Sequence, residues 1–200
     1  MPLSSTSTVQ LRDRVRGAYS IAAEHPDQKH AFPVGRQFAE SIGYPADLLA
    51  SLPSVACDAF AGVSNVSVFA EIPMGATVLD LGCGSGTDTL IAAGRVGASG
   101  KVIGVDFSGS MLSRAREAVS ESGIVNVELR ESDAERLPIA DGEIGVAIVN
   151  GIFNLNPARE AIFRELARVV RAAGTVYAAE LILSHPLPPE ARANESDWFA

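Results

Sequence analysis

One short stretch constrains the fold of this chain more than any other. Residues 77–81 are rich in β-branched and apolar side chains, Gly82, Gly84 and Gly86 follow at alternate positions, and a helix-type pattern begins at Thr87. Glycine lets the backbone adopt positive φ and approach a ligand closely, and the first turn of a helix offers unpaired N–H groups to an anionic group. The stretch therefore predicts a strand, a ligand-binding turn and a helix.

The rest of the chain after about residue 72 repeats this alternation. Further strand patterns cover residues 101–107, 126–130, 144–150 and 175–183, and helix patterns cover residues 87–96, 108–122 and 157–173. Five strands alternating with helices predict an α/β fold, a doubly wound and mostly parallel sheet with helices on both faces. Its ligands are expected at the carboxyl ends of the strands. In the last helix we expect these residues to face inward: Ile162, Phe163, Leu166, Val169 and Val170. Gly174 is expected to end that helix.

Residues 1–71 have a different, irregular helical pattern. Leu11, Val15 and Tyr19 lie on one apolar helix face, and that helix should end before Pro26. Shorter helix patterns cover residues 32–42, 45–52 and 55–60. We expect residues 1–71 to form a helical cap, either packed on the core or serving as a lid over a ligand.

The two remaining segments are assigned by the same patterns. Residues 72–184 are expected to form the ligand-binding α/β core, and residues 185–200 a C-terminal segment with a helix over 190–200. Too few residues follow Ser184 for two more strands, so we expect a truncated or incompletely represented chain, with a natural short form as the alternative, and in either case the fifth strand could be an exposed edge.

The composition limits the function classes. The 200 residues are 47% hydrophobic, which indicates one folded domain. Their formal net charge of −8 argues against non-specific binding to nucleic acid. No apolar run is long enough to span a membrane, and the N-terminus lacks the pattern of a signal peptide. Cys57 and Cys83 suggest neither a disulfide framework nor a zinc site. We expect a cytoplasmic protein that is monomeric or weakly self-associating.

Acidic residues follow the second and third strand patterns. Asp106 stands where a carboxylate can accept both hydroxyls of a ribose, although an acid there could instead cap the next helix. Asp133, at the end of the third strand, could accept from an adenine amino group or be a plain turn residue. A dinucleotide site would place a glycine at position 87, where a threonine stands, so an NAD-type oxidoreductase is the weaker alternative.

Taken together, these residues resemble the class I S-adenosylmethionine-dependent methyltransferases over about residues 72–184. Residues 80–86 (Asp-Leu-Gly-Cys-Gly-Ser-Gly) match the first motif of that family, and residues 104–106 match the second. Residues 132–138 look like the adenine-binding stretch of the small-molecule branch, which includes quinone-biosynthesis enzymes. The resemblance implies S-adenosylmethionine as cofactor and methyl transfer to a small-molecule acceptor.

The resemblance also implies roles for single residues. The three glycines would face the methionine half of the cofactor, Asp106 would hold the ribose and Asp133 the adenine amino group. Asn150 and Gly151, together with Tyr19 of the cap, would lie near the transferred methyl, and no residue is assigned as catalytic. No metal site is expected. The cofactor-binding candidates are Asp80, Gly82, Cys83, Gly84, Gly86, Asp106, Phe107, Ser108, Met111, Asp133, Ala134 and Asn150.

Within that branch the sequence is similar to arsenite methyltransferases, in residues 100–106, 150–155 and 187–192. That resemblance implies cysteine thiolates for As(III), one directly after Asn150 and one shortly before the first strand. Gly151 and residues 60–63 provide none, so we expect arsenite to be a poor substrate. An arsenite methyltransferase-like enzyme and a non-catalytic S-adenosylmethionine-binding protein remain alternatives. The family also completes its sheet with a sixth and a seventh strand, for which we expect no room here.

Overall fold

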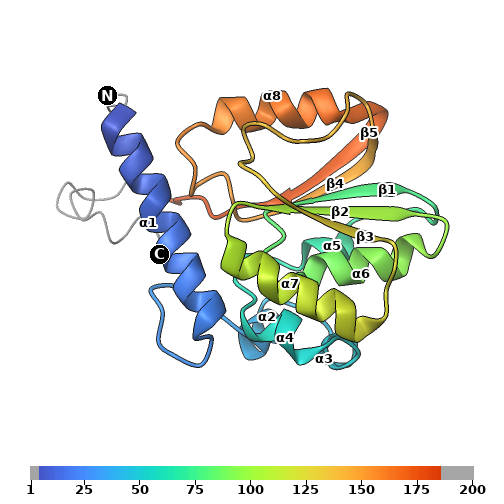
Figure 1. The fold of residues 1–200 in the computed structure, drawn as a ribbon, viewed down its shortest axis with the longest axis horizontal. Coiled ribbons are helices and arrows are strands. Elements are labelled where there is room, and N and C mark those ends of the chain that lie inside the picture. Colours follow the sequence, from blue (N-terminus) through green and yellow to red (C-terminus); the bar gives the residue numbers. More distant parts are fainter. Residues whose placement is uncertain (1–4, 186–200) are drawn as a thin grey trace.

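The structure, a computed structural model, describes residues 5–185, with side chains from residue 10 onward. Within this range five strands form one sheet in the order β3-β2-β1-β4-β5, and all neighbouring strands are parallel. Figure 1 shows this sheet edge-on. The predicted α/β fold class is confirmed. The strands are β1 (Thr77–Leu81), β2 (Lys101–Asp106), β3 (Val127–Glu131), β4 (Ile144–Asn150) and β5 (Val170–Ala179).

Helices cover both faces of the sheet. In Figure 1, α8 (Arg159–Val169) lies on one face, and α5 (Val66–Phe69), α6 (Thr87–Val96) and α7 (Gly109–Ser122) lie on the other. Leu79 and Val149 pack on the α8 side, whereas Val78 and Ile148 pack on the opposite side. Alternate residues of the central strands are therefore buried on both faces, as an all-parallel sheet requires.

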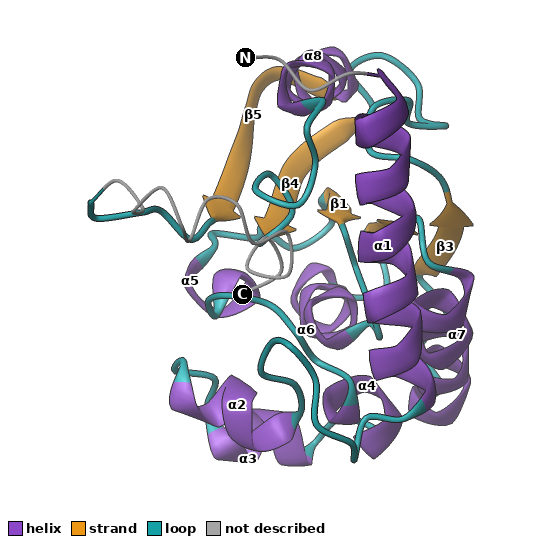
Figure 2. Ribbon diagram, turned by 90° about the vertical axis from the view of Figure 1, so that its left-hand side faces the viewer, coloured by secondary structure: helices purple, strands orange, loops and turns teal. Residues whose placement is uncertain are grey.

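The N-terminal helices pack onto this core from two directions. They are α1 (Ser5–Glu24), α2 (Arg36–Ser41), α3 (Ala46–Ala50) and α4 (Ser54–Asp58). In Figure 2, α1 crosses in front of the strand ends, and α2 to α4 lie beneath α6. Leu49 and Phe60 share a buried cluster with Leu90 and Ile91 of α6. Residues of the N-terminal helices and of the α/β core thus share one hydrophobic cluster. The division of the chain into domains at residue 72 stays a prediction.

The predicted boundary between the last helix and the last strand is wrong. Helix α8 ends at Val169, and β5 begins at Val170 rather than at Thr175. The register against β4 shifts between Ile144 and Val146, so residues 171–174 form a bulge that contains Gly174. A bulge of this kind depends on the partner strand, which a local pattern does not reveal.

Phe163 also departs from the prediction, because it is 54% exposed instead of buried. Its ring stacks on Phe153 of the loop after β4, with centroids 4.7 Å apart. The helix predicted over residues 190–200 lies outside the described residues. No helix in the described part of the chain is long and apolar enough to cross a membrane.

Candidate functional site

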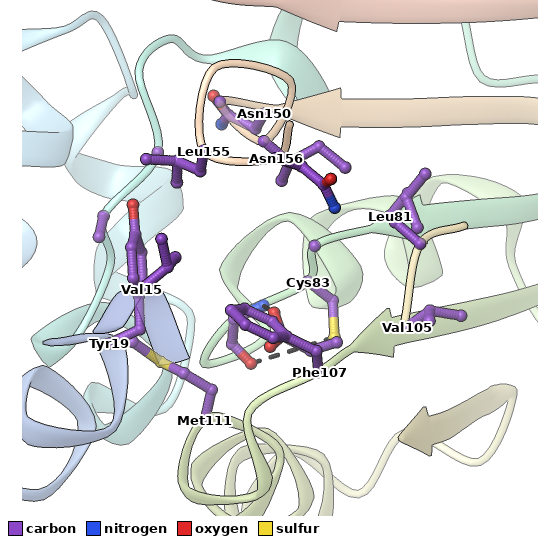
Figure 3. A pocket seen from close by; sticks show the side chains of 18 of the residues that line it. Val15, Tyr19, Leu81, Cys83, Val105, Phe107, Met111, Asn150, Leu155 and Asn156 are labelled. Carbon is purple, nitrogen blue, oxygen red and sulfur yellow. Dashed lines mark hydrogen bonds between the residues drawn. The ribbon is translucent and has the colours of Figure 1, made fainter. Parts of the chain in front are cut away.

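A pocket lies at the carboxyl ends of the strands, where the strand order reverses between β1 and β4 (Figure 3). Its walls come from the loops after β1, β2, β3 and β4, from α1 and from residues 59–62. Asp80, Gly86 and Ser108 lie behind these walls. The other predicted site residues line the pocket: Tyr19, Gly82, Cys83, Gly84, Asp106, Phe107, Met111, Asp133, Ala134, Asn150 and Gly151.

The turn after β1 uses its three glycines in different ways. All three have positive φ: 78° at Gly82, 51° at Gly84 and 93° at Gly86. A Cβ on Gly86 would lie 3.3 Å from Ala115, and one on Gly82 would collide with Ile152. A Cβ on Gly84 would meet nothing closer than 4.0 Å. The absence of a side chain at Gly84 therefore leaves the backbone open to a ligand, whereas at Gly82 and Gly86 it allows other side chains to pack closely.

Asp106 lines the pocket and also binds two backbone N–H groups, and its predicted role toward a ribose stays a prediction. Its carboxylate accepts from the N–H of Gly84 (2.9 Å) and from the N–H of Ser108 (2.8 Å), while Ser108 caps α7. Burial raises the pKa of Asp106, and its hydrogen bonds to backbone N–H groups oppose that shift. Asp106 thus fixes the glycine turn and the start of α7 and still faces the pocket.

Asp80 lies one layer deeper, between β1 and α6. It is almost fully buried and accepts from the hydroxyl of Thr89 at 2.5 Å. Burial, together with the nearby carboxylate of Asp88, raises its pKa well above the usual range. Asp80 therefore links the end of β1 to the first turn of α6, the two elements that the glycine turn connects.

Asp88, in the first turn of α6, is a buried carboxylate whose role the sequence did not reveal. Its oxygens accept from the Tyr44 hydroxyl (2.6 Å), from the Ser67 hydroxyl and from the Asn150 amide (2.9 Å). Burial raises the pKa of Asp88 and these donors oppose that shift. No sequence motif signals this network, because its members come from four separate segments.

The side chain of Asn150 links the end of β4 to the segment before α5. Its Oδ1 accepts from the N–H groups of Val63 (2.8 Å) and Ser64 (3.1 Å). The two segments touch so closely that a Cβ on Gly62 would lie 2.5 Å from Asn150 Nδ2, and a Cβ on Gly151 would lie 2.8 Å from Val63 Cγ1. Asn150 therefore holds one wall of the pocket in place.

The end of the pocket beside β3 is charged. Arg12 of α1 pairs with Asp133 at 2.5 Å and with Glu135 at 3.4 Å, and Arg16 lies 3.5 Å from Asp133. The Arg16 guanidinium also lies 5.3 Å from the centroid of the Phe107 ring. Glu135 Oε2 is buried and has no hydrogen-bond partner in the described structure. Arg12, Arg16 and Glu135 were not among the predicted site residues, because α1, which carries the two arginines, is distant along the chain from residues 133–135.

The two cysteines are both buried. Cys83 lines the pocket, and burial raises its pKa well above the usual range. Cys57 lies in the cluster between the cap and α6, and burial raises its pKa to about 11. Both groups are therefore neutral thiols near pH 7. The described residues contain no group of three or more His, Cys, Asp or Glu side chains that could hold a metal ion.

The sequence matches known proteins along much of its length. Residues 73–199 match a family model described as a methyltransferase domain. The chain is 40% identical over 152 residues to an arsenite methyltransferase of Halobacterium salinarum. The aligned region covers 76% of this chain and 39% of that protein. It is 36% identical over 115 residues to a demethylmenaquinone methyltransferase of Lactococcus lactis, with coverages of 58% and 45%. The chain spans less than half the length of these curated relatives.

Solved structures give a consistent result. An arsenic(III) S-adenosylmethionine methyltransferase from Chlamydomonas reinhardtii superposes with a TM-score of 0.61 at 26% identity, over 80% of this chain and 54% of that one. A SAM-dependent methyltransferase from Aquifex aeolicus gives a TM-score of 0.53 at 23% identity, over 79% and 80%, and supports the fold alone.

Proposed function

The chain belongs to the methyltransferase-domain family of S-adenosylmethionine-dependent enzymes, and on that basis we propose that it transfers a methyl group from S-adenosylmethionine to a small-molecule acceptor. The family resemblance and the cofactor predicted from sequence are confirmed. One observation carries the proposal for this pocket: the buried Asp106 carboxylate faces it, 2.9 Å from the N–H of the open Gly84.

The residues present fit the cofactor. Gly84 leaves space for the methionine half, and the Asp106 carboxylate retains lone pairs for the ribose hydroxyls. At the adenine end, Glu135 Oε2 is an acceptor without a partner in the described structure, and Asp133 lies beside it. Since a buried acceptor without a partner is costly, a ligand that donates to this end would stabilise it.

In this mechanism the protein binds the cofactor, orients the acceptor toward it and shields both from water. When bound, the cofactor supplies a methyl group already activated on a cationic sulfur. Asp106, fixed by two backbone N–H groups, would hold the nucleoside, while Phe60, Ile152 and Leu155 keep water from the reacting atoms. The acceptor would supply the electron pair for that methyl group, and the residues of the pocket would hold the two reactants together. Alignment of the two reactants supplies the rate enhancement.

Arsenite methylation is a second candidate, favoured by the 40% identity to the Halobacterium protein. The local chemistry argues against it. Where the resemblance implies thiols, Gly151 packs against Val63, and the buried Cys83 and Cys57 are neutral. As(III) requires two or three convergent thiolates, so arsenite is proposed to be a poor acceptor.

The experiment begins with S-adenosylhomocysteine binding by calorimetry, then measures methyl transfer from S-adenosylmethionine to arsenite in the presence of thiol. We expect S-adenosylhomocysteine to bind. We expect methylated arsenic to form no faster than it does in a protein-free control. Arsenic methylation that is lost in Cys57→Ser would promote the second candidate. The cytoplasmic location and the weak self-association expected from sequence stay predictions.

A further inference from the structure

The order of the strands divides the pocket into two ends. The loop after β3 lies at one end, and the loop after β4 lies across β1 from it. Arg12, Asp133 and Glu135 gather at the β3 end, which we call the adenosine end. The other end, the acceptor end, is formed by Val15 and Tyr19 of α1, by Phe60 and by Ile152 and Leu155 of the loop after β4.

Asp88 lines the pocket beside the acceptor end, and its carboxylate is not available to a ligand. Its two oxygens are taken by Tyr44, Ser67 and Asn150. The polar atoms of Asn150 are likewise bound to Asp88 and to the backbone of Val63 and Ser64. An anion or cation placed here would lose its hydration without gaining a counter-charge, which is costly.

One polar group remains for a ligand. The Tyr19 hydroxyl has no hydrogen-bond partner in the described part of the chain, and Figure 3 shows it pointing toward Leu155 and the loop after β4. The Tyr19 ring stacks on Phe32 with centroids 4.6 Å apart, which restrains the ring and with it the position of the hydroxyl oxygen. Burial and the negative charges of Asp106 and Glu180 raise the pKa of Tyr19, so it remains a neutral phenol.

We infer that the acceptor of this methyltransferase is an uncharged, largely apolar molecule oriented by a hydrogen bond to the Tyr19 hydroxyl. The inference rests on the proposed function, because the acceptor end is defined relative to the bound cofactor. It distinguishes this pocket from one built for phosphorylated, carboxylated or thiolate-bound acceptors. Glu180 does not alter that reading, because its carboxylate accepts from the N–H groups of Phe153 and Asn154 and holds the β4 loop.

The test uses two probes of nearly equal shape, 4-isopropylphenol and 4-hydroxybenzoate, which differ in charge. Each is titrated by calorimetry into protein saturated with S-adenosylhomocysteine. We expect 4-isopropylphenol to bind at least about tenfold more tightly, because the carboxylate has no partner at the acceptor end. Tyr19→Phe should weaken 4-isopropylphenol by up to about tenfold, the loss of one hydrogen bond, and weaken S-adenosylhomocysteine much less.

The introduction of a positive charge supplies the second measurement. Leu155→Lys should shift the preference toward 4-hydroxybenzoate, and Leu181→Lys, an exposed residue beyond β5 that does not line the pocket, is the matched control. Equal affinities for the two probes, a preference of the wild-type protein for the carboxylate, or no binding of 4-isopropylphenol would each overturn the inference. Failure of the proposed function is separate, since it appears as no binding of S-adenosylhomocysteine in the first titration.

Discussion

The adenosine end and the acceptor end of the pocket are built by different means. The adenosine end takes its acids from the last residue of β2 and from the loop after β3, and its walls carry charge. The acceptor end is apolar, and its wall is held by hydrogen bonds such as that between Ser64 and Asn150, which are 86 residues apart in sequence. The comparison indicates that the acids of the proposed adenosine end can be recognised from local sequence patterns, whereas the wall of the proposed acceptor end depends on contacts between distant segments.

The largest expected effect is at the turn that both ends share. Gly84→Val should lower the affinity for S-adenosylhomocysteine by about 1000-fold or more, about 4 kcal/mol, because a β-branched residue resists a φ of 51° and its side chain would enter the pocket. Calorimetry measures the affinity. Gly94→Ala in α6, where a Cβ meets nothing within 4 Å, is the control and should bind normally. Retained affinity in a folded Gly84→Val protein would mean that the turn is only structural.

The second effect isolates the acceptor end. Asp88→Ala should lower the free energy of unfolding by about 3 kcal/mol, because it leaves the buried donors of Tyr44, Ser67 and Asn150 without their acceptor. Urea denaturation measures the loss, and Tyr44→Phe, which removes one donor, should cost less. A destabilisation below about 0.5 kcal/mol would show that the network does not hold this wall.

The third effect isolates the adenosine end. Asp106→Ala should weaken S-adenosylhomocysteine by about 1.5–3 kcal/mol, the cost of losing charge-assisted hydrogen bonds. Because Asp106 also holds Gly84 and Ser108, thermal unfolding of the unliganded variant is measured beside the calorimetry. Affinity unchanged within error would remove Asp106 from the cofactor site.

Most of the fold and the adenosine end follow from sequence. The first four strands were located within one or two residues, since β-branched runs and glycine turns are local signals. The start of β5 was missed because its bulge is set by the register against β4. Phe163 was missed because its partner, Phe153, belongs to a loop and not to the sheet.

The supports of the site were the least predictable part. Tyr44, Ser67 and Asn150 meet at Asp88 from separate segments, and each alone is an ordinary polar residue. Arg12 reaches Asp133 only because α1 crosses the strand ends. Local patterns carry no information about such pairings, because they arise when distant elements pack.

A smaller, pH-dependent effect lies behind the glycine turn. The folded state raises the pKa of Asp80 through burial and through the nearby carboxylates of Asp88 and Asp106, while the hydrogen bonds from Thr89 oppose that shift and the neutral thiol of Cys83 lies beside the group. Above the pKa of the unfolded state, about 4, folded Asp80 keeps a proton that the unfolded chain releases. Stability should therefore fall as pH rises through this window, by up to about 1.4 kcal/mol per unit. Asp80→Asn should flatten that slope in urea denaturation between pH 4 and 8, and an unchanged slope would assign it to other groups.

The smallest effect concerns the tether between α1 and the adenosine end. The Arg12–Asp133 pair is partly exposed, with 29% and 43% of the two side chains accessible, so solvent screens it. Arg12→Gln should lower the free energy of unfolding by less than about 1 kcal/mol at low salt, and the difference from wild type should disappear near 1 M salt. Urea denaturation at both salt concentrations measures it. Arg36→Gln, which removes the exposed pair with Glu40 away from the pocket, is the matched control. A loss in the free energy of unfolding above about 2 kcal/mol that persists in high salt would mean that Arg12 stabilises the fold by side-chain packing and not by its ion pair. Since α1 also carries Val15 and Tyr19 at the acceptor end, the packing of α1 would then support both ends of the pocket.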